Sequence, residues 1–552
     1  MKRLKISLLT LLSLAFITFS CDEDVALIEQ ELADNPIPGE TTGNPGTLNF
    51  SNYVAIGNSL TAGFMDGALY TDGQNNSFPN LLAGQLSTSG VGGGSFEQPD
   101  INSANGFNSS FSDVANGVIA GRTELDLTIP GPVPTSGELP AAYTGDKSTL
   151  NNFGVPGMRI VDGLSPGLAS NGLYARFATN PGTSTVVGDA LATSPTFFTY
   201  WLGNNDILGY AIGGGTNEAA ITSQGDFQAA LQQQLGALVQ SGAQGVVLTI
   251  PQIVLIPYFR AVPYNSIPVT SQAQADQLNA GFAGFNAALD GLVQASALVP
   301  SLNVTQAEAD ARKVSYSLGA NPILMEDDAL VDYDRPGGEF DQLQAIGGIT
   351  AAQRQALAPF GQSRPATSDD LPTLVAATQL GNTVGGNAAA LIGVTVPAAD
   401  NLILSASEVQ TVVGQRATFN ATIAGVVQGL NAQAGNAITL VDVQPFFADL
   451  FGLSPALASF LVDPTGGANP ALAAMASAAA AAADGELGIR VDGVNLAPDF
   501  GPNGVFSTDG VHPNPRGHGI VANIIIEALN AERGADIPSV NVIALRGIIA
   551  AQ

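Results

Sequence analysis

Short apolar runs alternate with helical stripes along most of this chain, and this rhythm restricts the possible folds more than any other feature. Four runs have the length and the β-branched or aromatic content of buried strands: residues 53–57, 196–202, 246–250 and 438–443. Four segments have the apolar spacing or the start signals of helices: residues 78–86, 227–239, 405–433 and the segment that begins at Asn514-Pro515. Strands that alternate with helices favour a parallel sheet, so the sequence predicts an α/β fold.

Three stretches do not follow this rhythm, and we interpret them as insertions into one domain that spans residues 49–535. They are residues 89–148, 255–400 and 446–500. The last contains an alanine tract, residues 471–483, whose high helix propensity favours a surface helix, with a lid helix as the alternative. Residues 536–552 are expected to form a C-terminal tail.

An acidic run within the second insertion has two interpretations. It consists of Glu326, Asp327, Asp328, Asp332 and Asp334. Carboxylates at this density can bind Ca²⁺, but the run lacks the spacing and the glycine of a known calcium loop. We therefore favour a solvated surface and expect no metal site here.

The composition excludes several classes of protein. A formal net charge of −29 leaves no basic patch for phosphates, so nucleic acid is not an expected partner. A hydrophobic fraction of 45% with only 12% charged residues excludes a mainly disordered acidic chain. A single cysteine and two histidines exclude an intramolecular disulfide, a cysteine zinc cluster and a histidine-rich metal site.

The N-terminus has the pattern of an export signal that ends at the only cysteine. A positively charged start precedes an apolar segment over residues 6–19, which is too short for a comfortable membrane span. Ser20 and Cys21 follow, and they resemble the end of a bacterial lipoprotein signal, which implies that residues 1–21 are a signal peptide with a lipidated Cys21. An ordinary signal peptide with a chance cysteine is the alternative.

The residues after Cys21 bear on where such a lipoprotein would reside. Asp22, Glu23 and Asp24 resemble the surface-export signal of Bacteroidetes lipoproteins, whereas in other bacteria an Asp here implies retention at the inner membrane. Residues 22–48 have the Pro, Gly and Thr content of a tether. The expected location is the cell envelope, at the outer membrane and exposed on the surface, with the lipid as the only membrane anchor. No later segment has 18 uninterrupted apolar residues, so we expect a soluble body.

The scarcity of histidine narrows the search for a catalytic base to His512 and His518. Asp509 lies three residues before His512 on a glycine-containing loop, so its carboxylate can reach the imidazole and hold its tautomer. His518 has no nearby acid, and a hydrogen bond at a helix start is its expected role. Ser59 follows the strand of residues 53–57, at the strand end where parallel sheets build their sites. It is a candidate nucleophile, although a serine here can also be merely a helix N-cap.

Four short motifs lie at the expected strand ends. They are Gly57-Asn58-Ser59-Leu60, Asn152-Phe153-Gly154-Val155-Pro156-Gly157, Gly203-Asn204-Asn205-Asp206 and the segment from Asp509 to Pro513. In this order they resemble the sequence blocks of the GDSL, or SGNH, hydrolase family. Each motif is weak alone, but their joint occurrence is specific. The resemblance implies a flavodoxin-like, three-layer α/β/α core with a parallel sheet and large insertions.

The resemblance also assigns roles to individual residues. Ser59 would be the nucleophile, His512 the general base and then the general acid, and Asp509 the residue that orients His512. The oxyanion hole would comprise the backbone N–H groups of Ser59 and Gly157 and the side chain of Asn205. Donors of this kind contribute about 3 kcal/mol each in comparable sites. No metal or cofactor is implied.

Two positions depart from the family pattern. Asn58 replaces the usual Asp, which is not a member of the triad, so we expect activity to survive. Pro156 stiffens the second motif and narrows the space beside Gly157. Phe198 and Trp201, on the strand before the third motif, are expected to pack in the core.

The resemblance implies a serine esterase or lipase that hydrolyses carboxylic esters through an acyl-enzyme. A carbohydrate O-acetylesterase is a narrower alternative, and a binding lipoprotein on an inactive scaffold is the alternative outside enzymes. The expected partner is a small ester or an acylated glycan or lipid. The sequence does not decide among these substrates, and it does not predict an oligomeric state.

Loops at the carboxyl edge of an open α/β sheet border its active site. The insertions at residues 255–400 and 446–500 leave from that edge and carry aromatic residues such as Tyr258 and Phe447. We expect them to cover the Ser59 pocket and set its selectivity, with a separate lobe as the alternative.

Overall fold

A parallel sheet forms the centre of the computed structural model, which describes residues 42–128, 131–299, 302–453 and 487–551. Within these residues the sheet has five strands in the order β15-β6-β5-β1-β4, all paired in parallel. They are β1 (Tyr53–Gly57), β4 (Asn152–Gly154), β5 (Phe197–Trp201), β6 (Gln244–Leu248) and β15 (Ile438–Val441). Counted along the chain, the order is 2-1-3-4-5, one of the two common orders of doubly wound sheets. The predicted α/β class with a parallel sheet is confirmed.

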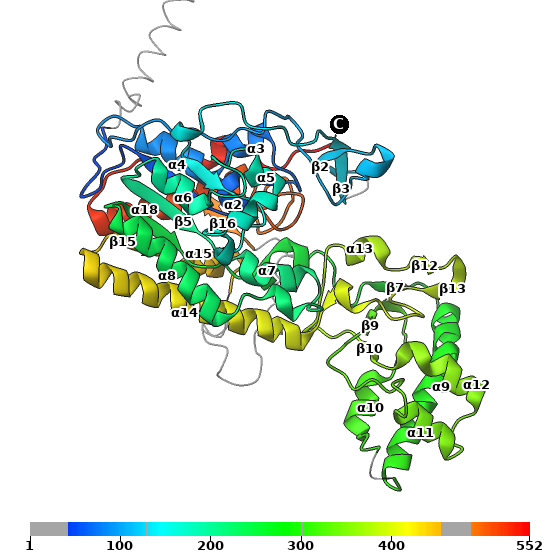
Figure 1. The fold of residues 1–552 in the computed structure, drawn as a ribbon. Helices are drawn as coiled ribbons and strands as arrows, with labels where there is room; N and C mark the ends of the chain where they lie inside the picture. The colour runs from blue at the N-terminus through cyan, green and yellow to red at the C-terminus, as the bar shows by residue number, and fades with distance from the viewer. Residues whose placement is uncertain (1–41, 129–130, 300–301, 454–486, 552) are drawn as a thin grey trace, which may run out of the picture.

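Helices cover both faces of this sheet (Figure 1). Alternate residues of β1 point into different hydrophobic clusters: Tyr53 and Ala55 into one, Val54 and Ile56 into the other. The helices on the first face are α4 (Phe78–Leu86) and α18 (Pro515–Arg533), and those on the second include α6 (Val186–Ala192), α7 (Asn205–Ile212), α8 (Gln224–Gln240) and α14 (Ala406–Ala434). Burial on both faces explains why the strands read as continuous apolar runs rather than as alternating ones.

The ends of the long helices follow local signals in the sequence. α14 begins with a capping box, in which Ser405 and Glu408 each bond the other's backbone N–H, and it ends at Gly435 with a φ of 69°. α18 begins at Pro515 after the N-cap Asn514, whose side chain accepts from the Gly517 N–H. The predicted strand at residues 53–57 and helix at residues 78–86 have the predicted bounds, and the other predicted elements are present with shifted ends.

Residues 264–403 form a lobe with a hydrophobic cluster of its own, which projects beyond α7 in Figure 1. Phe282, Phe285 and Leu289 of α9 share this cluster with Tyr316 and Phe340. The helices of the lobe are α9 (Gln272–Ser296), α10 (Gln306–Arg312), α11 (Glu339–Ala345), α12 (Ala351–Leu357) and α13 (Ala376–Gln379). Its short strands pair as β7 (Ile267–Val269) with β8 (Gly319–Asn321), β9 (Leu324–Glu326) with β10 (Ser363–Pro365), β11 (Leu371–Pro372) with β14 (Ile403–Leu404), and β12 (Thr383–Val384) with β13 (Asn387–Leu391).

The remaining α-helices and strands are short elements outside the central sheet and the lobe. They are α2 (Ser59–Ala62), α3 (Thr71–Asn75), α5 (Gly172–Ala175), α15 (Gln444–Leu450), the hairpin of β2 (Ala120–Asp126) with β3 (Gly131–Ser136), and the hairpin of β16 (Ile489–Val491) with β17 (Val494–Leu496). The first insertion thus contains a β-hairpin, for which the sequence shows no strong period.

Both ends of the described chain are bound to the domain. Asn44 lies in the predicted tether, yet its backbone pairs with that of Asp536, just after α18. In the C-terminal tail, the N–H of Ala551 donates to the carbonyl of Leu125 in β2. The predicted signal and Cys21, and the alanine tract, lie outside the described residues. Among the described helices, none is both long and apolar enough to cross a membrane.

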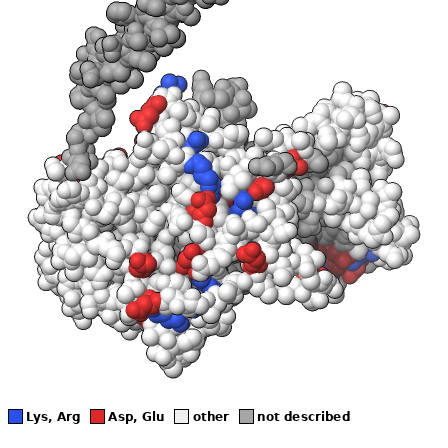
Figure 2. All heavy atoms as spheres, turned by 90° about the horizontal axis from the view of Figure 1, so that it is seen from above, with Lys and Arg blue, Asp and Glu red and all other residues white. Residues whose placement is uncertain are grey.

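Charged side chains are sparse on the face seen in Figure 2. Asp and Glu are scattered among uncharged residues, and the few Lys and Arg lie next to acidic side chains. This face therefore has no continuous basic area, in keeping with the strongly acidic composition.

Candidate active site

Ser59 is the first residue of α2, directly after the sharp turn at Asn58 that follows β1, at the carboxyl edge of the sheet. The residue that caps α2 is Asn58, whose Oδ1 accepts a hydrogen bond of 3.1 Å from the Leu60 N–H. The interpretation of Ser59 as an N-cap is therefore wrong, and its hydroxyl is directed elsewhere. Glycine is required at Gly57, because a β-carbon there would lie 2.0 Å from Thr61 Oγ1.

Ser59, His512 and Asp509 are joined by a continuous chain of hydrogen bonds. His512 Nε2 lies 2.9 Å from Ser59 Oγ, and His512 Nδ1 lies 2.9 Å from Asp509 Oδ2. The ring of Phe64 packs against the imidazole with a centroid distance of 5.0 Å and restricts its rotation. The structure thus brings together the three predicted residues, although 453 positions separate Ser59 from His512. Their order is that of nucleophile, base and orienting acid.

The Asp509 carboxylate is held by several donors besides the imidazole. The backbone N–H groups of Val511 and His512 donate to its Oδ1 at 2.8 and 2.9 Å, and the N–H of Gly67 donates to its Oδ2 at 3.0 Å. Burial acts to raise the pKa of Asp509, but the charge of His512 and the hydrogen bonds outweigh it and lower the pKa to about 2. Asp509 is therefore an anion that fixes the Nδ1–H tautomer of His512.

Asp66 holds the loop of residues 507–512, and the sequence analysis missed it. Its Oδ1 accepts from the N–H and the hydroxyl of Thr508, at 3.0 and 2.9 Å. Its own N–H donates to Ser507 Oγ at 3.0 Å, and the hydroxyl of Tyr70 donates to its Oδ2 at 2.7 Å. Asp66 is 1% exposed and has a φ of 54°. An Asp-Gly pair marks a turn in the sequence, but no local signal identifies partners more than 400 positions away.

The predicted oxyanion donors lie at the neighbouring strand ends. Gly157 follows β4 with a φ of 82°, in the left-handed region that favours glycine. Asn205 opens α7 after β5, and its Nδ2 donates to the carbonyl of Met158 at 3.1 Å, which ties it to the Gly157 turn. Within the described residues, the backbone N–H groups of Ser59 and Gly157 donate to no acceptor. Both are therefore available to a developing oxyanion.

His518 takes no part in the triad and instead bonds the start of a helix. Its Nδ1 accepts a hydrogen bond of 3.2 Å from the N–H of Phe78, the first residue of α4. The predicted bond at a helix start is confirmed, although the helix is α4 rather than α18. Burial lowers the pKa of His518 to about 3, and the nearby charge of His512 adds to this effect. Phe198 and Trp201 are buried in the core as predicted.

A pocket opens beside Ser59. Ser59, His512 and Asn205 are part of its lining, and Trp201 adds a second role to its core packing by forming part of the wall. α15 supplies another wall with Phe446, Phe447 and Leu450.

The two later insertions therefore differ in their relation to this pocket. Of residues 446–500, the described side chains of Phe446, Phe447 and Leu450 in α15 border it, as expected. From residues 255–400, the described lining includes only Ile256, and most of that stretch forms the lobe. The expectation that residues 255–400 cover the pocket is wrong, because these residues bury their apolar side chains against one another.

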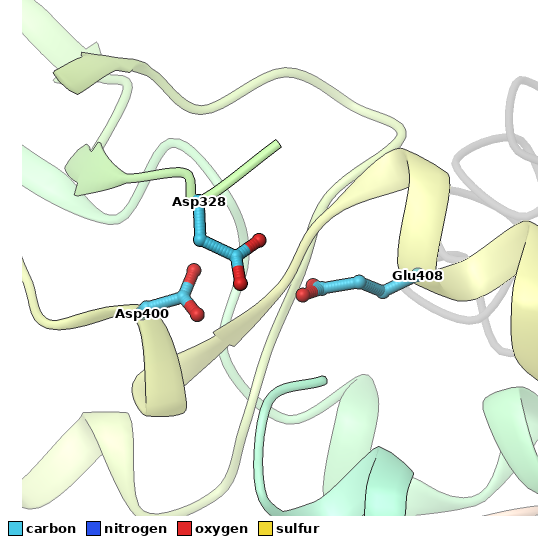
Figure 3. A group of neighbouring side chains, drawn as sticks. All are labelled: Asp328, Asp400 and Glu408. Carbon is cyan, nitrogen blue, oxygen red and sulfur yellow. The ribbon is translucent and has the colours of Figure 1, made fainter. Parts of the chain in front are cut away.

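The acidic run of the second insertion is not a uniformly solvated surface. Asp327 is buried, and its carboxylate lies 2.6 Å from the Arg364 guanidinium. Asp328 instead converges with Asp400 and Glu408 where the lobe meets α14 (Figure 3). Ligand atoms of these three residues lie within 4.8 Å of one another, a spacing that would suit a cation. Burial raises the pKa of Asp400 and of Glu408 to about 7. Protonation near neutrality therefore relieves the repulsion without an ion.

Comparisons with models of protein families, with curated proteins and with solved structures found no match. The interpretation of the site therefore depends on its geometry and on the motifs in the sequence.

Proposed function

We propose that this protein is a serine hydrolase of the SGNH type that hydrolyses carboxylic esters. The observation that carries the proposal is the hydrogen-bonded chain from Ser59 through His512 to Asp509, with two links of 2.9 Å. The nucleophile and the base also line a pocket, so a substrate can reach them.

The fold supports the same proposal. The strand order 2-1-3-4-5 is that of flavodoxin-like sheets, and helices on both faces give the three layers that the family resemblance implies. Ser59 follows β1, Gly157 follows β4 and Asn205 follows β5, so three adjacent strands deliver the site to one edge of the sheet.

In the first half of the proposed reaction, Ser59 Oγ bonds to the ester carbonyl carbon while His512 Nε2 takes the hydroxyl proton. The negative charge on the carbonyl oxygen is stabilised by the N–H groups of Ser59 and Gly157 and by the Asn205 amide. Anionic Asp509 stabilises the imidazolium that forms on His512. The C–O bond to the alcohol then breaks, and His512 returns the proton to the leaving oxygen.

In the second half, water attacks the acyl-enzyme and His512 again takes a proton. The tetrahedral intermediate collapses, the bond from the acyl carbon to Ser59 Oγ breaks, and His512 protonates the serine oxygen. The acid leaves and the free enzyme is restored. This chain's own residues suffice for each proton transfer.

A fluorophosphonate probe tests this proposal, because it labels activated serine nucleophiles. We expect labelling at Ser59 and turnover of nitrophenyl esters in the parent protein. Ser59→Ala should lose labelling and lower kcat by at least about 10⁴-fold. Its free energy of unfolding should change by less than about 0.5 kcal/mol, because no core cavity is created.

The exposed Ser87, the C-cap residue of α4, provides a matched control. Ser87→Ala should keep both labelling and turnover. A folded parent protein that neither reacts with the probe nor turns over any ester would favour the non-catalytic binding lipoprotein. Turnover restricted to acetylated polysaccharides would favour the O-acetylesterase.

We further propose that the protein is exported and anchored in the cell envelope by a lipid on Cys21. The support comes from the sequence alone: the charged start, the apolar segment over residues 6–19 and the only cysteine directly after it. The proposed substrates are small esters or acylated lipids or glycans, without a metal or cofactor and without nucleic acid.

A further inference from the structure

We propose that the pocket beside Ser59 holds the hydrocarbon chain of a fatty acyl group, so that esters of medium- and long-chain fatty acids are preferred to acetyl esters. This inference rests on the proposed function, because it assumes that Ser59 attacks the ester carbonyl. It selects one substrate class among those that the proposed chemistry allows.

The lining of the pocket consists of a few polar side chains and a larger apolar part, here called its body. The polar side chains of its lining are Asn58, Ser59, Asn204, Asn205 and His512, which all come from the three motifs around the nucleophile. The rest of the described lining is hydrocarbon or aromatic, apart from the indole of Trp201 and one glycine. The indole N–H of Trp201 already donates to the carbonyl of Thr249 at 3.0 Å, so it is not a free donor for a bound ligand.

The polar side chains of the lining have unused hydrogen-bonding capacity. Asn58 Nδ2 and both polar atoms of the Asn204 amide are buried and lack a partner within the described residues. The two side chains belong to residues that are only 1% and 5% exposed, so solvent does not satisfy them easily. Leaving such groups unpaired is costly, but these atoms are buried from solvent, so they would bind an ester oxygen only after neighbouring side chains move.

The body of the pocket suits an alkyl chain and no sugar. Its walls come from α15 (Phe446, Phe447 and Leu450) and from Ile253 and Ile256 after β6. A sugar ring placed there would lose hydrogen bonds to water without replacement. An acetyl group would leave most of the apolar wall in contact with water, whereas each methylene of a longer chain removes more of that wall from water.

A series of nitrophenyl esters from acetate to palmitate, below their micelle concentrations, tests the proposal on the full chain. We expect kcat/KM to rise with chain length, by up to about fourfold per buried methylene, until the pocket is filled. A profile that is highest for acetate and falls for longer chains would overturn the proposal.

Narrowing the pocket adds a second readout. Phe446 of α15 and Leu208 of α7 both line the pocket, and both are only partly buried, so a larger ring has room to adjust. Phe446→Trp and, separately, Leu208→Trp should each lower the ratio of kcat/KM for long esters to that for acetate by at least tenfold. Phe111→Trp, at a residue that is 48% exposed and outside the pocket lining, is the matched control and should keep the parent ratio.

These outcomes separate the inference from the proposed function. Absence of both probe labelling and ester turnover in the folded parent would contradict the proposed function. Probe labelling with a ratio that neither Trp variant changes would contradict the acyl pocket alone. Probe titration of each variant gives the fraction of active sites, so a partly misfolded variant does not imitate a change in selectivity.

Discussion

His512 and His518 lie six positions apart, yet the structure gives them different environments. His512 bridges Ser59 and Asp509 at the pocket, whereas His518 is fully buried and accepts a hydrogen bond from α4. Asp509 has a pKa of about 2 and His518 one of about 3, so neither changes its charge between pH 5 and 8. The part of the catalytic pH profile that falls in that range should therefore come from neither of these two residues.

The first prediction at this scale concerns that profile. A protonated imidazole cannot accept the Ser59 proton, so kcat/KM should fall as the pH is lowered. His512→Gln should lower kcat by about 10⁴-fold or more. His518→Gln keeps an acceptor in the side chain and should retain both the activity and the midpoint of the acid limb, as measured by a pH–rate profile from pH 4 to 9. A shifted midpoint in the His518 variant would contradict this assignment.

The second prediction concerns Asp66 as a positioning residue. Asp66→Ala removes the acceptor that holds Thr508, so the loop with Asp509 and His512 loses its register. Misplacement by about 1 Å costs up to about 10²-fold in rate, so kcat should fall by 10- to 100-fold. KM should change less than kcat, because Asp66 does not line the pocket.

Steady-state kinetics beside circular dichroism test this role. Asp66→Asn preserves an acceptor oxygen for Thr508 and should recover part of the lost kcat. If Asp66→Ala loses stability but keeps the parent kcat at a temperature where it is folded, Asp66 serves the fold alone.

At the scale of elements, the turns at the strand ends place the site. β1 passes directly into α2, and Asn58 provides the cap that leaves the next side chain, Ser59, free for His512. Asn58 provides this cap through its side-chain oxygen, an acceptor that an Asp at this position would also have. At Gly154, a β-carbon would lie 2.3 Å from the backbone nitrogen of Ala62, so glycine allows α2 to approach β4.

The start of α14 carries the third prediction. Glu408 belongs to the capping box of this helix, and burial raises its pKa and that of Asp400 to about 7, above the unfolded values of about 4. Because the folded pKa values are raised, the contribution to stability is fully present below about pH 4 and is lost as the pH rises through 7. Asp400→Asn removes one of these charges and should stabilise the protein more at pH 8 than at pH 5.

Urea unfolding at the two pH values measures this difference, with Asp276→Asn as the control at an exposed carboxylate of α9. An equal effect of Asp400→Asn at both pH values would contradict the prediction. A large stabilisation of the parent by added Ca²⁺, lost in Asp400→Asn, would instead assign a cation to these carboxylates.

At the scale of the whole molecule, the sheet domain and the lobe have separate hydrophobic clusters. The segment that leads from the N-terminus joins the domain at Asn44, beside the residue that follows α18 by three positions, Asp536. An anchor on Cys21 would thus be connected to the side of the domain through residues 22–43.

The fourth prediction follows from this arrangement. Cys21→Ser should move the protein from the membrane fraction to the soluble fraction, because the described helices offer no other span. Ester turnover by the released protein should be unchanged, since the active site lies in the domain. Immunoblots of fractionated cells provide the measurement. Continued sedimentation with membranes would indicate another mode of attachment.

The sequence by itself determined the elements and the candidates. Strand residues 53–57 and helix residues 78–86 were predictable because apolar periodicity and helix caps are local signals. The triad and oxyanion candidates, such as Ser59 and His512, were predictable because short motifs preserve their order at strand ends. The first insertion had no clear period, and its β2–β3 hairpin was not predicted.

Only the tertiary structure decided which residues meet. The hydrogen bonds of Asp66 to Thr508 span 442 positions, and that of His518 to Phe78 spans 440, so no local pattern could indicate them. The same holds for the pocket, whose lining combines residues from α7, α15 and the loop of His512. The lobe at residues 264–403 is the clearest example, because its apolar side chains form a hydrophobic cluster of their own. Composition predicts that apolar side chains will be buried, but packing in three dimensions decides which partners bury them.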